Sequence, residues 1–195
     1  MIESLKQIDT SIFLFLNSLH LEVLNSFMVL LSGKLIWSPF ILFALFQAYK
    51  KLGKKGFGLF FLFWLLTLVA SDVTASSLFK NIFLRPRPCK EDDLEKLIYH
   101  FGQKCGGRYG FISSHAANSF GLITFYLGIL NPQSKWKYSL WLIPVAVSFS
   151  RIYLGVHYPS DLIIGAIVGI TWANALIFTF KNSLWGQAGH SPNPI

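Results

Sequence analysis

Residues 57–70 read FGLFFLFWLLTLVA, a run in which Thr67 is the only polar side chain. Together with the residues that follow as far as Lys80, this run is long enough for a transmembrane helix, which needs about 20 mostly apolar residues. Further apolar segments on either side of it are of similar or slightly shorter length: 25–49, 114–130, 138–153 and 160–180. The sequence therefore predicts an all-α, polytopic membrane helix bundle with five transmembrane helices.

The N-terminal residues 1–20 have a different pattern. Ile8, Ile12 and Phe15 fall on one side of a predicted helix, and Asp9 and Asn17 lie elsewhere on it. This pattern is typical of an amphipathic helix lying in the membrane interface. A sixth span is the alternative, although the apolar run before Asn17 is short for one.

The composition agrees with a lipid environment. Of 195 residues, 53% are hydrophobic and 13% are charged, against about 25% charged in an ordinary soluble domain. The length fits a single integral membrane domain, placed at residues 1–181, followed by a polar, flexible tail at 182–195. Many of the lysines behind the net charge of +8 flank apolar segments, so we expect membrane lipids and no nucleic acid as partners.

Basic residues in the short loops predict the orientation, because cytoplasmic loops are enriched in lysine and arginine. Lysines follow the first, third and fifth apolar segments: Lys50, Lys51, Lys54, Lys55, Lys135, Lys137 and Lys181. The loop 85–111 and the short turn around His157 then face the periplasm or cell exterior of a membrane that we expect to be a bacterial inner membrane. No basic region of a cleavable signal peptide opens the chain.

The two cysteines, Cys89 and Cys105, both lie in the loop 85–111. In an oxidising compartment they can form a disulfide, which would contribute roughly 3 kcal/mol in the chain-entropy model. Two free thiols are the equal alternative, because the sequence does not give their geometry.

Three polar clusters lie at the predicted outer ends of the helices, where polar residues are functional candidates. In the first cluster, Lys80 is followed after six residues by Arg87-Pro88. Arginine presents a planar fork and lysine a point charge, and both suit phosphate oxygens. Taken alone, this cluster is better explained as a snorkelling lysine and a basic anchor for lipid headgroups.

The second cluster, Ser113-Ser114-His115, opens the third main apolar segment. Helix N-termini bind anions through their free N–H groups, and serine hydroxyls add donors. The simpler interpretation is that Ser113 is a helix N-cap with His115 at the interface.

The third cluster is Ser150-Arg151, five residues, His157, three residues and Asp161. A carboxylate hydrogen-bonded to histidine fixes the imidazole tautomer and leaves the other nitrogen free to attack. Although Asp161 could simply cap a helix, we favour a functional interpretation here. The three clusters together provide a nucleophile, an acid and cations for a dianionic group at one membrane face.

These clusters resemble the signature of the type 2 phosphatidic acid phosphatase superfamily: Lys, six residues, Arg-Pro; then Pro-Ser-Gly-His; then Ser-Arg, five residues, His, three residues, Asp. The first and third match at every fixed position and spacing. The second departs from the pattern, because Ile112-Ser113-Ser114-His115 keeps the serine and the histidine but lacks the proline and the glycine. The resemblance covers residues 80–161 and implies a membrane lipid phosphatase.

The resemblance also implies a phosphate-binding set. Lys80, Arg87 and Arg151 would contact the phosphate oxygens, and Ser113 and the backbone N–H of Ser114 would add hydrogen bonds.

The catalytic roles are implied in the same way. His157 would attack phosphorus to form a phosphohistidine, and Asp161 would orient it. His115 would protonate the leaving oxygen and then activate water. The family needs no metal or other cofactor, in agreement with the lack of a carboxylate or Cys/His ligand cluster in the sequence.

One acidic residue, Asp72, lies inside the second apolar segment. Asp72, Ser76 and Lys80 are spaced to lie on one helix face. They form either a polar track that supports Lys80 or a site of interhelical hydrogen bonding, and the two interpretations have equal weight.

Several substrates share this chemistry, so the sequence leaves open phosphatidylglycerol phosphate, phosphatidic acid, undecaprenyl pyrophosphate and lipid A phosphate. Transfer of the phosphate to another lipid also stays open, as does the oligomeric state. A vanadate-dependent haloperoxidase shares the anion site, but such proteins are typically soluble. A non-catalytic lipid-binding protein or a transporter, whose charges would line a path across the bilayer, is the remaining class. Here the charges gather at one face.

Overall fold

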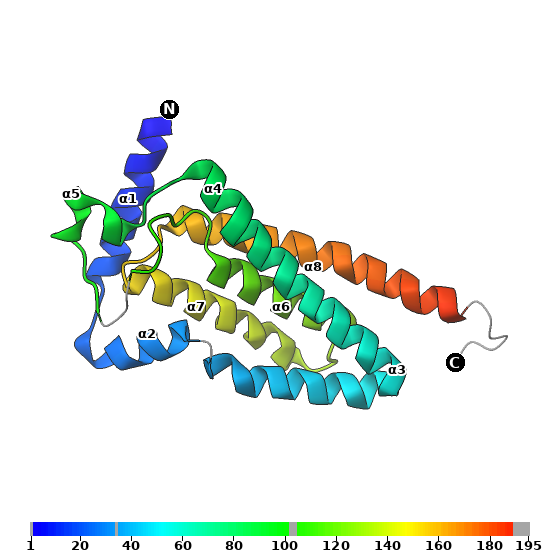
Figure 1. Cartoon of the computed structure of the whole chain (residues 1–195). Helices are drawn as coiled ribbons and strands as arrows, with labels where there is room; N and C mark the ends of the chain where they lie inside the picture. The colour runs from blue at the N-terminus through cyan, green and yellow to red at the C-terminus, as the bar shows by residue number, and fades with distance from the viewer. Residues whose placement is uncertain (1, 34, 102–104, 189–195) are drawn as a thin grey trace.

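The computed structural model describes residues 2–33, 35–101 and 105–188, which form helices joined by turns and loops (Figure 1). The α-helices are α1 (Ile2–Ser18), α2 (Asn25–Ser32), α3 (Ser38–Val73), α4 (Lys80–Phe83), α5 (Asp92–Glu95), α6 (Ser114–Leu130), α7 (Leu142–Tyr153) and α8 (Pro159–Ala188). A π-helical turn, Thr74–Phe79, joins α3 to α4. The predicted all-α class is confirmed for the described residues, whose extended pairing is limited to an isolated bridge between Pro86 and Tyr109.

Helix α3 folds back on itself at Gly53, where φ is 64° and ψ is −177° (Figure 1). Glycine adopts positive φ without the steric cost that other residues meet. The two arms pack through aromatic rings, with centroids 6.2 Å apart for Phe40 and Trp64 and 5.7 Å apart for Tyr49 and Phe57. This turn lies between the two apolar segments predicted at 25–49 and 56–80.

The segment predicted as one helix at 25–49 is interrupted, so that expectation was wrong. Helix α2 ends at Ser32, Gly33 takes an extended conformation, and α3 begins at Ser38 with Pro39 in its first turn. Proline is tolerated in a first turn but not inside a helix, so a continuous helix is disfavoured here. Because α2 ends at Ser32, the carbonyl of this residue is available to a side chain from another helix.

The C-terminal boundary also differs from the prediction. Helix α8 continues to Ala188, beyond the start of the flexible tail expected at 182. The sequence contains no proline between Pro159 and Pro192, so nothing there forces the helix to end. The rest of the predicted tail, 189–195, lies outside the described residues.

Among the described residues, two helical stretches are long and apolar enough to cross a membrane, Leu35–Phe83 and Pro159–Ser183, and a third qualifies if α1 and α2, bent by 92°, count as one. The first stretch contains both arms of α3. Helices α6 and α7 are shorter, at 17 and 12 residues. The number of spans, five or six, therefore stays a prediction.

The closest packing in the bundle is between α6 and α8, where small residues let the two backbones meet. A Cβ atom at Gly169 would overlap the Ala117 carbonyl oxygen, and one at Gly165 would lie 2.7 Å from the Ser113 carbonyl oxygen. At the end of this seam, the Ser113 N–H donates to the Asp161 carbonyl at 3.0 Å. The second and third polar clusters are thereby brought together.

We expect Gly169→Ala to destabilise the protein by about 1–3 kcal/mol, because an added methyl group must push α6 and α8 apart. Thermal unfolding in detergent measures this effect. Gly58→Ala is the matched control, because a Cβ atom there meets nothing within 4 Å. Equal melting temperatures for the two variants would contradict the close packing.

Candidate active site

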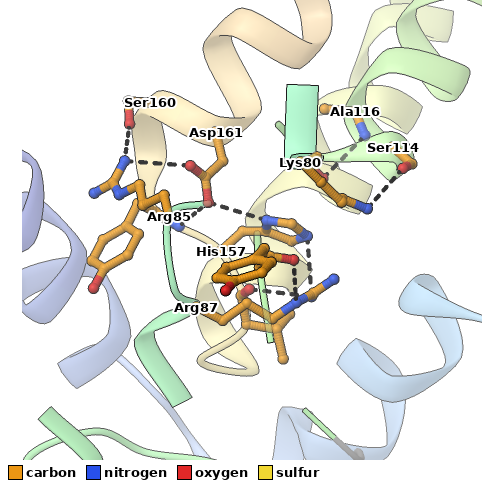
Figure 2. Close-up of polar contacts among 12 residues, drawn as sticks. Lys80, Arg85, Arg87, Ser114, Ala116, His157, Ser160 and Asp161 are labelled. Carbon is orange, nitrogen blue, oxygen red and sulfur yellow. Dashed lines mark hydrogen bonds and ion pairs between the residues drawn. The ribbon is translucent and has the colours of Figure 1, made fainter. Parts of the chain in front are cut away.

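His157 and Asp161 form a buried pair at the start of α8 (Figure 2). His157 Nδ1 lies 3.1 Å from Asp161 Oδ2, which also accepts the Tyr158 N–H at 3.1 Å. Because a carboxylate accepts hydrogen bonds, Nδ1 carries the hydrogen and Nε2 keeps its lone pair. The first turn of α8 thus fixes the histidine with an unprotonated Nε2 facing away from the carboxylate.

Arg87 lies beside that nitrogen. Its Nη1 atom is 3.4 Å from His157 Nε2 and 3.4 Å from the Val156 carbonyl oxygen, and its Nε atom donates to the Tyr109 carbonyl at 3.3 Å. Main-chain carbonyls therefore hold the guanidinium beside Nε2, where it would contact an anion that this nitrogen attacks (Figure 2).

Gly110 packs against this group with little room to spare. A Cβ atom there would lie 3.0 Å from Arg87 Cγ, 3.3 Å from Asp161 Oδ2 and 3.6 Å from His157 Nδ1. The absence of a side chain lets the loop backbone lie directly on the pair. The sequence analysis did not identify this glycine, because its role comes from a contact between distant segments.

Lys80 reaches the start of α6, where its Nζ atom donates to Ser114 Oγ at 3.2 Å (Figure 2). Ser113 is the N-cap of α6, and its Oγ accepts from the Ala116 N–H at 3.5 Å. The N-cap interpretation of Ser113 therefore describes its side chain in this structure, whereas Ser114 lies beside the lysine.

His115 and Arg151 meet at Ser32, the last residue of α2. Arg151 donates to Ser32 Oγ, and His115 Nε2 lies 3.2 Å from the Ser32 carbonyl oxygen. A carbonyl only accepts, so His115 carries hydrogen on Nε2 and presents Nδ1 as its other nitrogen. Ser32 had no predicted role, and the break after α2 is what frees its carbonyl.

The residues predicted for the site are thus brought together at one end of the bundle. Arg87, Arg151 and Lys80 all act electrostatically on His157, and Arg151 and His157 act on His115. Within the described residues, groups of three or more His, Cys, Asp or Glu suited to a metal ion do not occur. The donor set is cationic and suits an anionic ligand.

Arg85 and Asp9 complete a network that sequence reasoning missed. Arg85 donates to Asp161 Oδ1 at 3.3 Å, to Asp9 Oδ2 at 2.7 Å and to Ser160 Oγ at 2.7 Å. Asp9 also accepts the Ser160 N–H at 2.9 Å. Asp9 stands 76 residues before Arg85, so no spacing in the sequence links the two.

The loop that carries both arginines is closed by a disulfide between Cys89 and Cys105, whose Cα atoms are 6.1 Å apart. This answers the question that the sequence left open. Two main-chain hydrogen bonds hold the beginning and the end of this loop together. The Arg87 N–H donates to the Arg108 carbonyl at 3.1 Å, and the Gly110 N–H donates to the Arg85 carbonyl at 2.9 Å.

Burial lowers the pKa of His157 well below its usual value, and the positive charge of Arg87 lowers it further. Burial also lowers the pKa of Arg87, an effect that the Asp161 carboxylate opposes. Since a lowered pKa keeps imidazole unprotonated, His157 is neutral at physiological pH, as a nucleophile must be.

Comparison with known proteins agrees with this geometry. The family model of the PAP2 superfamily matches residues 61–185. The chain belongs to the PAP2 superfamily.

Three curated relatives of the chain are phosphatases. The chain is 36% identical over 172 residues to the lipid A 4'-phosphatase of Bacteroides thetaiotaomicron, covering 87% of this chain and 75% of that protein. It is 32% identical over 199 residues to the lipid A 4'-phosphatase of Porphyromonas gingivalis, covering 98% and 82%. The undecaprenyl-diphosphatase of Sulfolobus acidocaldarius is 30% identical over 173 residues, covering 86% and 76%.

Two solved structures share the fold. Aquifex aeolicus LpxE superposes with a TM-score of 0.66 at 24% identity, covering 86% of this chain and 93% of that one. The transmembrane PAP2 type phosphatidylglycerolphosphate phosphatase of Bacillus subtilis gives 0.68 at 21% identity, covering 92% and 87%. The family model, the curated relatives and the apolar helices together show an integral membrane protein of the PAP2 superfamily, a lipid phosphatase that hydrolyses phosphate esters.

We expect His157 to stay neutral as the pH falls through 6.5, its unshifted pKa. Arg87→Gln should raise the pKa of His157 toward that value, because one nearby positive charge is removed. NMR titration of protein labelled at histidine measures the pKa of His157 in wild type and in Arg87→Gln. The His157 resonance is assigned by its loss in His157→Ala. Protonation of wild-type His157 at or above pH 6.5 would show that burial does not control this group.

We expect Asp9→Asn to lower kcat roughly tenfold or more with little change in KM, because Arg85 would lose one of the carboxylates that position it against Asp161. Steady-state phosphate release measures this, and Asp9→Glu should restore part of the rate. Glu3→Gln is the control, because its ion pair with Lys6 on the same helix is exposed. An unchanged kcat in Asp9→Asn would show that the contact between Asp9 and Arg85 does not contribute to catalysis.

Proposed function

We propose that this enzyme removes a phosphate group from a membrane lipid through a phosphohistidine on His157, without a metal. The observation that carries the proposal is the buried His157–Asp161 pair at 3.1 Å with Arg87 3.4 Å from the opposite ring nitrogen. This geometry supports a role for His157 as a neutral, oriented nucleophile beside a cation, Arg87, that would hold its target.

The phosphate would bind among Lys80, Arg87 and Arg151, which spread positive charge around its oxygens. The N-terminus of α6 adds the Ser114 N–H, and its dipole favours an anion. Ser113, which caps α6, would support this end of the site. Its hydroxyl would reach the phosphate only by changing partner from the Ala116 N–H.

In the first step, His157 Nε2 would form a bond to phosphorus while the bond from phosphorus to the lipid oxygen breaks. His115, protonated on both ring nitrogens when the phosphate dianion is bound beside it, would give its Nδ1 proton to that oxygen and keep its Nε2–H on the Ser32 carbonyl. In the second step, His115 would take a proton from water, the water oxygen would attack phosphorus, and the P–N bond would break to release phosphate. Asp161 would stabilise the positive charge that develops on His157.

Among the candidate substrates, we propose a lipid A phosphate. Support comes from the two lipid A 4'-phosphatases, whose matches cover most of this chain. Undecaprenyl pyrophosphate is the runner-up, supported by the relative from Sulfolobus acidocaldarius. Phosphatidylglycerol phosphate, phosphatidic acid and phosphate transfer to another lipid have less support.

We also propose that the site faces the periplasm from a bacterial inner membrane. The turn of α3 at Gly53, with its flanking lysines, and the connection from α6 to α7 lie at the end of the bundle opposite the turn that carries His157 (Figure 1). Basic connections are typical of the cytoplasmic side, and this supports a site on the opposite, periplasmic side.

The test is phosphate release by the purified protein in detergent, with a chelator present, from lipid A and a panel of other lipid phosphates. We expect His157→Ala to lower the rate by about 10³-fold or more, and His100→Ala, an exposed histidine in the outer loop, to leave it unchanged. Radiolabelled phosphate should appear on the wild-type protein and not on His157→Ala. A His157→Ala variant with the wild-type rate would rule out the mechanism.

A further inference from the structure

A cavity of about 530 Å³ adjoins the site and enters the bundle between the two arms of α3 and helix α6. Ser114 and His115 line its outer end, and Leu122 lines it two turns further along α6, about 12 Å deeper. Because the site and the cavity share His115, a lipid whose phosphate reaches His157 would place the rest of its polar unit in this cavity.

Most of the cavity wall is apolar, with Ile41 and Leu68 among its members, but Asp72 and Asn118 also line it. Asn118 Nδ2 donates to Asp72 Oδ1 at 3.0 Å, joining α6 to α3. The interhelical interpretation of Asp72 therefore holds for this contact. A carboxylate has further acceptor positions, so one hydrogen bond does not use its full capacity.

The depth of the pair decides which part of a lipid it meets. Asn118 lies one helical turn beyond Ser114, the partner of Lys80, or about 6 Å further from the phosphate-binding end. In a lipid whose phosphate is carried by a sugar or glycerol unit, hydroxyl and amide groups lie at that depth. In an alkyl or prenyl phosphate, the same space receives hydrocarbon.

We propose that Asp72 and Asn118 form a subsite for a hydrogen-bond donor on the sugar or glycerol unit of the substrate. The pair then selects such lipid phosphates against alkyl and prenyl phosphates. The selection follows from desolvation, since a carboxylate covered by hydrocarbon loses water without gaining a partner. This inference rests on the proposed function and names the substrate class of the same site.

The test compares two single-chain monophosphates in detergent, 1-acylglycerol 3-phosphate and dodecyl phosphate, which differ in the polar groups next to the phosphate. We expect wild type to favour the glycerol compound in kcat/KM by roughly tenfold or more. Asp72→Leu should abolish this preference, by losing activity on the glycerol compound and gaining it on dodecyl phosphate. Asp72→Asn, which keeps hydrogen-bonding groups, should retain it.

Ser76→Ala is the matched control, because its hydroxyl donates to the Asp72 backbone carbonyl one turn earlier in the chain, so its loss should not alter the preference. Equal wild-type rates on the two compounds would overturn the inference alone. A proportional loss on both compounds in Asp72→Leu would also overturn it, and would assign Asp72 to the support of Lys80. Failure of wild type to release phosphate from either compound would count against the proposed function itself.

Discussion

The hydrogen bond from the Ser113 N–H to the Asp161 carbonyl, at 3.0 Å, is the constraint on which the rest of the site depends. It forms where α6 and α8 both begin, at the end of a seam that Gly165 and Gly169 allow to close. Two helix N-termini thus point into one region, and their dipoles favour an anion there. The side chains that open each helix, Ser114 and His115 on α6 and Asp161 on α8, are brought together as a consequence of backbone packing.

The charges around this junction divide into two groups. Arg85 is neutralised by Asp9 and Asp161, at 2.7 and 3.3 Å, and its guanidinium carbon lies 3.8 Å from the centre of the Tyr158 ring. Arg87 instead contacts main-chain carbonyls and the neutral His157, and Lys80 contacts a hydroxyl. Buried cations without a paired carboxylate are costly, and a bound phosphate dianion would offset that cost. Arg85 is therefore paired within the protein, while Arg87 and Lys80 are the cations that would attract the proposed phosphate ligand.

How much the sequence predicts depends on the range of each interaction. Helix α6 has the bounds predicted for it, 114–130, because a serine N-cap and a continuous apolar run are local signals. The site members Lys80, Arg87, His115, Arg151, His157 and Asp161 could be named because fixed spacings within short segments carry the pattern. Ser32 could not be named, since its role depends on a helix break that hydrophobic composition does not show. Asp9 and Gly110 could not be named either, because their partners come from distant segments.

The N-terminal helix shows why those distant contacts matter. From the sequence, α1 was interpreted as an amphipathic helix resting in the interface, and half of that description holds, because one face carries exposed Ile8 and Phe15. The other face is built into the protein, however. Phe13 is fully buried, and Asn17 donates to the carbonyl oxygens of Tyr99, Ile152 and Tyr153, each at 3.0 Å.

Two turns before Asn17, Asp9 holds Ser160 and Arg85. Helix α1 therefore joins three segments that carry site residues. They are the end of α7 with Arg151, the start of α8 with Asp161, and the loop 85–111 with Arg87. Helix α1 is thus part of the framework of the site. Its amphipathic pattern therefore reflects contacts with α7, α8 and the loop 85–111 on one face, opposite a face that carries exposed apolar side chains.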